Sequence, residues 1–135
     1  MRKLLFSFLA VVWSIAPLTA LDTATEVYRI DFTSGQGDWT IDNVTLDGLS
    51  RVWQHSTYED NSFMKASAYK NNTPYTAESW LISPVIDLSE AATATLSVRQ
   101  AMKFGKDGMY VRMTADGKDW KDVSVSPTPS GNSWT

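Results

Sequence analysis

The chain has 135 residues, twelve basic and fifteen acidic side chains, a formal net charge of −3 and no cysteine. The lack of cysteine excludes a scaffold held by disulfides and a thiol nucleophile. The acidic balance, with Lys and Arg scattered along the chain, argues against nucleic-acid binding. The sixteen aromatic residues (six Trp, five Tyr and five Phe) are enough to build a hydrophobic core.

The N-terminus has the three-part layout of a secretory signal peptide. Arg2 and Lys3 precede an apolar run from Leu4 to Ile15, and the small residues of Ala16 to Ala20 follow. The run is shorter than the roughly 20 apolar residues of a spanning helix. We therefore expect residues 1–20 to be cleaved, leaving a secreted or cell-surface chain without a transmembrane segment. Residues 21–135 then form one domain. Without Arg2 and Lys3 it has ten basic and fifteen acidic residues, a net charge of 10 − 15 = −5.

Short runs of alternating apolar and polar residues follow the signal, and helical periodicity is hard to find. In the first run Tyr28, Ile30 and Phe32 share one face, and a polar loop is expected over residues 56–62. Ser83-Pro84 interrupts a later run, which indicates an edge or a bulge because proline cannot donate to a ladder. The candidate strands are residues 27–32, 39–44, 51–55, 63–69, 80–82, 85–88, 95–101, 109–115 and 118–125.

The clearest local signal is the Asp116-Gly117 pair, which separates the last two candidate strands. Such a pair between alternating runs predicts a tight hairpin, because both turn residues need positive φ. This number of short strands, without crossover helices, predicts an all-β fold: a jelly-roll-like antiparallel β-sandwich. We expect one contiguous core made of Phe32, Trp39, Trp80, Leu81 and Leu96.

Several motifs occur in an order that resembles the choice-of-anchor J domains, relatives of the cleaved-adhesin domains in exported proteins of the Bacteroidetes. The resemblance covers about residues 30–134, and its most specific piece is the run from Trp80 to Leu88. The other segments that carry it are Asp31-Phe32, Trp39 to Val44, Val52-Trp53, Met64 to Tyr69, Ala94 to Val98 and Val111 to Trp120.

This resemblance implies a jelly-roll sandwich with no catalytic role and an adhesive or accessory task in surface proteins. It also implies that calcium is bound, with Asp31 among the ligands. Domains of this family usually continue for several more strands than this chain has, so we expect the sandwich to be incomplete at its C-terminus, near Ser133 to Thr135.

No combination of residues points to catalysis, and we assign no catalytic residue. His55 is the single histidine, no Gly-x-Ser-x-Gly elbow occurs, and zinc lacks its usual ligands. The acidic groups Glu59-Asp60 and Asp116, Asp119 and Asp122 could pair as in a glycosidase, but turn preference accounts for them better. Oxygen ligands suit calcium, so a cation held by Asp31 and backbone carbonyls stays open.

Trp53, His55 and Tyr58 lie close together at a strand-loop junction. If exposed, they form a platform for stacking on a sugar or a peptide; alternatively, Trp53 belongs to the core, as large aromatics usually do. The sequence thus predicts a non-catalytic extracellular binding or adhesion module whose ligand is a glycan or a host protein. The alternatives are a structural spacer of a larger surface protein and, less favoured, a fragment of a carbohydrate-active enzyme.

Overall fold

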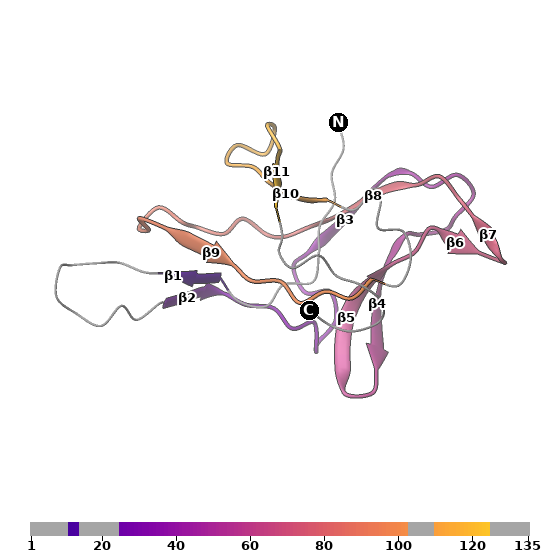
Figure 1. The fold of residues 1–135 in the computed structure, drawn as a ribbon, viewed down its shortest axis with the longest axis horizontal. Helices are drawn as coiled ribbons and strands as arrows, with labels where there is room; N and C mark the ends of the chain where they lie inside the picture. Colours follow the sequence, from indigo (N-terminus) through magenta and orange to yellow (C-terminus); the bar gives the residue numbers. More distant parts are fainter. Residues whose placement is uncertain (1–10, 14–24, 103–109, 125–135) are drawn as a thin grey trace.

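A computed structural model describes residues 11–13, 25–102 and 110–124. In these ranges the regular structure consists of strands, and the paired strands run antiparallel (Figure 1). The strands are β1 (Val11–Trp13), β2 (Thr25–Tyr28), β3 (Thr40–Thr45), β4 (Trp53–Tyr58), β5 (Asn61–Ala66), β6 (Tyr69–Lys70), β7 (Thr73–Pro74), β8 (Glu78–Ile82), β9 (Ala94–Leu96), β10 (Val111–Met113) and β11 (Lys121–Val123).

The strands form one three-stranded sheet, in the order β2-β1-β9, and the two-stranded sheets β3-β8, β4-β5, β6-β7 and β10-β11. The pair β3-β8 joins distant parts of the chain, with Thr40 opposite Ile82 and Asp42 opposite Trp80. The all-β fold class is confirmed, whereas the closed sandwich and its jelly-roll topology stay predictions. In the ranges that the structure describes, no helix is long and apolar enough to cross a membrane.

The first predicted strand was wrong beyond Tyr28, where β2 ends. A turn replaces the extended backbone, because the Asp31 carboxylate accepts a hydrogen bond from the Thr33 N–H at 2.8 Å and the Phe32 carbonyl accepts one from Gly35 at 3.0 Å. Phe32 has φ +58°, a left-handed conformation that is unusual for a bulky residue. Its side chain is nevertheless buried, so packing holds the strained residue in place.

The predicted polar loop over residues 56–62 was also wrong. β4 and β5 extend through this segment as a hairpin, paired from Trp53–Ala66 to Tyr58–Asn61. Only Glu59 and Asp60 connect the strands, and Glu59 takes the positive φ of +52° that such a short turn needs. The polar residues Ser56, Thr57 and Ser62 therefore belong to a protruding ladder (Figure 1).

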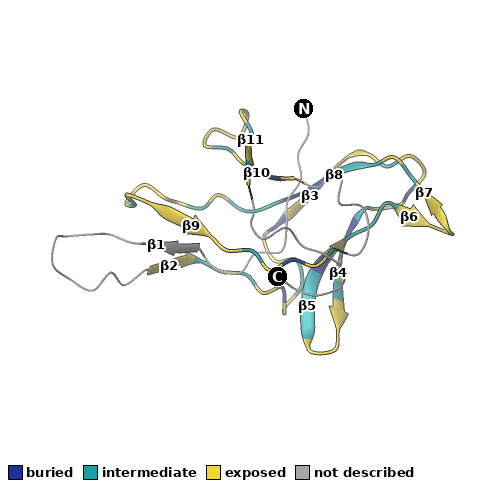
Figure 2. Cartoon of the chain, viewed as in Figure 1, coloured by how far each residue is buried: buried dark blue, intermediate teal, exposed yellow. Residues whose placement is uncertain are grey.

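The hydrophobic core gathers around β8 (Figure 2). Phe32, Trp39, Trp80 and Leu81 are fully buried, as expected, but Leu96 is 39% exposed and does not belong to the core. Leu81 lies in a cluster with Phe32, Trp39, Trp53, Met64 and Val111. Successive side chains of a strand point to opposite faces, so Trp80 packs on the other side of β8. There it meets Trp120 edge to face, with ring centroids 5.4 Å apart.

The C-terminal hairpin is confirmed, with Val111 opposite Val123 and Met113 opposite Lys121. The predicted tight turn was wrong: residues 114–120 form a longer loop, in which Gly117 has a positive φ and Asp116 does not. An Asp116 carboxylate oxygen accepts hydrogen bonds from the backbone N–H groups of Lys118 and Asp119, at 2.8 and 2.9 Å. These bonds favour a loop wound around the carboxylate over a tight turn.

Candidate functional site

The predicted platform of Trp53, His55 and Tyr58 does not form. Trp53 is only 3% exposed, and its indole N–H donates to the Ser79 carbonyl at 3.3 Å, so this ring belongs to the core. His55 Nε2 lies 2.9 Å from the Phe32 carbonyl; a carbonyl only accepts, so Nε2 carries the proton and holds the turn at Phe32. Tyr58 is 69% exposed near the hairpin tip, and alternation places it on the face opposite Trp53 and His55.

Asp31 is exposed and lies in the turn after β2. The hydrogen bond from the Thr33 backbone N–H lowers the pKa of this carboxyl below its usual value. Calcium takes six to eight oxygen ligands. In the part of the chain that the structure describes, no three His, Cys, Asp or Glu side chains gather as ligands of a metal ion. Calcium binding stays a prediction from the resemblance.

The acidic residues considered for catalysis have local structural roles. Glu59 and Asp60 form the β4-β5 turn. Backbone donors from Asp119 and Lys118, together with the Thr114 hydroxyl, lower the pKa of Asp116 to about 2. Asp122 accepts a hydrogen bond from Arg112 across the C-terminal hairpin, and the Arg112 guanidinium lies over the Tyr110 ring at 5.1 Å. These contacts agree with the interpretation of the acids as turn and surface groups.

A site that the sequence interpretation missed lies on the outward face of the β4-β5 hairpin. Trp53 and Met64 point into the core, so alternation turns their neighbours outward. Gln54 lies directly opposite Lys65 on this face. The Ser67 N–H donates to the Val52 carbonyl at 3.0 Å, which continues the pairing past the end of the ladder.

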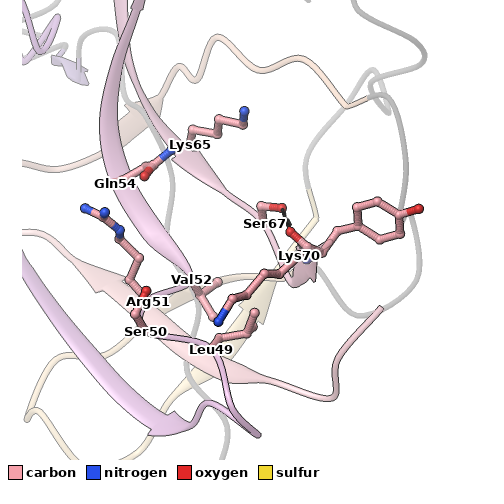
Figure 3. A pocket seen from close by; sticks show the side chains of 9 residues that line it. Leu49, Ser50, Arg51, Val52, Gln54, Lys65, Ser67 and Lys70 are labelled. Atoms are coloured by element: carbon pink, nitrogen blue, oxygen red, sulfur yellow. Dashed lines mark hydrogen bonds between the residues drawn. The ribbon is translucent and has the colours of Figure 1, made fainter. Parts of the chain in front are cut away.

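Val52, Gln54, Lys65 and Ser67 line part of a cavity of about 240 Å³, which we call the hairpin pocket (Figure 3). Three of the lining residues are cationic: Arg51 from the segment before β4, Lys65 from β5 and Lys70 from β6. Lys70 bends back toward this segment, since its Nζ donates to the Gly48 carbonyl at 3.4 Å. The pocket is lined by Leu49, Ser50, Arg51, Val52, Gln54, Lys65, Ser67, Tyr69 and Lys70.

The hairpin pocket combines many hydrogen-bond donors with two apolar residues. Its lining includes two hydroxyls, an amide, a phenol and three cationic groups, together with the apolar Leu49 and Val52. Tyr58 shares the outward face with Gln54, and alternation places Phe63, opposite Ser56, between them on this face. Such a surface can bind a polar ligand by several hydrogen bonds and by contact with an exposed ring.

Comparisons with known proteins find no matching family model, no similar curated protein and no similar solved structure.

Proposed function

We propose that this chain is a non-catalytic, exported binding module of the kind found in surface adhesins, and that the outward face of the β4-β5 hairpin binds its ligand. The hairpin pocket is the observation that carries this proposal, because it combines a concave shape with many hydrogen-bond donors. The signal-peptide pattern and the resemblance to choice-of-anchor J domains support an extracellular ligand. We propose a glycan, since sugars present many hydroxyls to such donors and the exposed Tyr58 ring can stack on a sugar face.

A host or other extracellular protein is the second candidate for the ligand. The hairpin protrudes from the rest of the described chain (Figure 1), so a partner protein has access to its outward face. The rival function is a spacer that positions other domains and binds nothing at this surface. The two functions differ in one measurable respect, which is whether substitutions in the hairpin pocket change binding.

We expect the exported chain to bind members of a glycan array, or immobilised extracellular proteins, through the hairpin pocket. A Gln54→Ala/Ser67→Ala variant should weaken binding about tenfold, because it removes two hydrogen bonds of roughly 0.7 kcal/mol each. The matched control is Thr57→Ala/Ser62→Ala, which removes two polar groups near the tip of the same hairpin. If no glycan or protein is retained, or if both variants bind like the wild type, the spacer is the better function.

A further inference from the structure

We propose that the hairpin pocket selects an acidic glycan, one that carries sulfate or carboxylate groups. This inference rests on the proposed function and adds the chemical class of the ligand. Three of the nine residues that line the pocket are cationic, and none of these lining residues carries a carboxylate. The whole chain has an excess of acidic residues, with a net charge of −3, so the pocket concentrates the opposite charge.

The ion pairs among the described residues lie outside the hairpin pocket. Ion pairs occur elsewhere, between Arg29 and Glu26 and between Arg112 and Asp122. Within the described ranges, Arg51, Lys65 and Lys70 form no ion pair, and Lys70 makes its hydrogen bond to a backbone carbonyl. All three side chains are exposed, so their charged ends remain available to a bound anion.

The donors of the pocket match the chemistry of a sulfate or carboxylate group. The Arg51 guanidinium can bind two oxygens of such a group at once, and the lysine ammonium groups act as point charges. Ser50, Gln54 and Ser67 add neutral hydrogen-bonding groups beside them. The cavity of about 240 Å³ falls below the roughly 300–1,000 Å³ of drug-binding pockets. It therefore fits one charged sugar unit of a longer chain better than a whole small molecule.

The inference is tested by measuring the binding of dextran sulfate to the exported chain. Uncharged dextran of equal length is the neutral control. We expect dextran sulfate to bind and an excess of dextran not to displace it. Binding of polygalacturonate shows whether carboxylate groups can take the place of sulfate groups. Each exposed charge contributes about threefold to affinity. The variant Arg51→Gln/Lys65→Gln/Lys70→Gln should therefore weaken binding about thirtyfold. Binding should also weaken at high salt, because salt screens exposed charges.

The matched control is Arg29→Gln/Lys118→Gln/Lys121→Gln, which removes the same charge from exposed residues outside the pocket. An equal loss in both variants would mean nonspecific attraction and overturn the proposal. A single-stranded DNA of the same length serves as a second polyanion. If the chain binds it as tightly as dextran sulfate, and the pocket variant loses this binding too, the pocket binds any polyanion and the proposal of an acidic glycan is overturned. Neutral glycans whose binding is weakened by Gln54→Ala/Ser67→Ala but not by the loss of the three cations would overturn the inference and leave the proposed function intact.

A measurement on the wild type covers the case in which the triple variant fails to fold. Lysine acetylation is followed by mass spectrometry with and without dextran sulfate. We expect bound dextran sulfate to slow the modification of Lys65 and Lys70 and to leave Lys118 and Lys121 unchanged. Equal protection of all four lysines would contradict a site in the hairpin pocket.

Discussion

Leu81 and Leu96 carry the same side chain, but Leu81 is fully buried and Leu96 is 39% exposed. Replacing Leu81 by Ala removes buried methyl groups and leaves a cavity, so we expect a loss of roughly 2–5 kcal/mol of unfolding free energy. Leu96→Ala removes the same atoms from an exposed site and should cost less than about 1 kcal/mol. Chemical denaturation of the two variants checks the difference. Similar losses would mean that Leu96 also belongs to the core.

The buried aromatics show how far single residues could be predicted. Trp39 and Trp80 were expected in the core, and both are buried. The sequence left two positions of Trp53 open, in an exposed platform with His55 and Tyr58 or in the core. Its burial depends on distant partners: the ring packs with Leu81 and donates to the Ser79 carbonyl, contacts that depend on how the hairpin lies on β8. Leu96 lies on β9, which pairs with β1 in a different sheet, and is partly exposed there.

At the scale of elements, the Asp116 carboxylate organises the loop of the β10-β11 hairpin. Its pKa is lowered to about 2 by hydrogen bonds from the backbone N–H groups of Asp119 and Lys118 and from the Thr114 hydroxyl. The folded pKa lies below the ordinary value of 3.8, so the ionised carboxylate stabilises the loop at neutral pH. This contribution is complete above the ordinary pKa and is lost as the pH falls from about 4 toward about 2.

We therefore expect a carboxyl NMR titration of Asp116 to have its midpoint near 2. Thr114→Val removes one donor to the carboxylate and also the hydroxyl that accepts from the Gly117 N–H at 3.0 Å. The titration midpoint of Asp116 should rise in this variant, and the hairpin should become less stable at neutral pH than in the wild type. An unchanged midpoint would mean that the loop does not depend on this hydroxyl.

The hairpin pocket shows why a site can escape prediction at this scale. Its cations, Arg51, Lys65 and Lys70, are scattered in the sequence, and no motif joins them. The β4-β5 register brings Lys65 opposite Gln54, but a predicted loop over residues 56–62 conceals that register. The short turn at Glu59-Asp60 lacks the glycine or asparagine that would have signalled it. The four consecutive polar residues from Gln54 to Thr57 also hide the apolar-polar alternation that would have indicated β4.

At the scale of the whole molecule, β1 (Val11–Trp13) links two strands that are far apart in the sequence. Val12 lies opposite Glu26 of β2 and opposite Thr95 of β9. β1 also lies within residues 1–20, the expected signal peptide. Both neighbours run antiparallel to β1 and hence parallel to each other, about 10 Å apart across its position. Cleavage of the signal would therefore remove the partner that β2 and β9 share.

We expect β2 and β9 to lose backbone protection in the cleaved chain, because most of their side chains are exposed and supply little packing to hold a new parallel pair together. Hydrogen exchange of the full chain and of residues 21–135 measures this. The amides of Thr25–Tyr28 and Ala94–Leu96 should exchange faster in the cleaved form, whereas those of β3 and β8 around the buried Trp80 should keep their protection. Unchanged protection of β2 and β9 would mean that the two strands pair with each other or with another segment once β1 is gone. Faster exchange in β3 and β8 as well would mean that the core depends on β1, and that the fold described here belongs to the uncleaved chain.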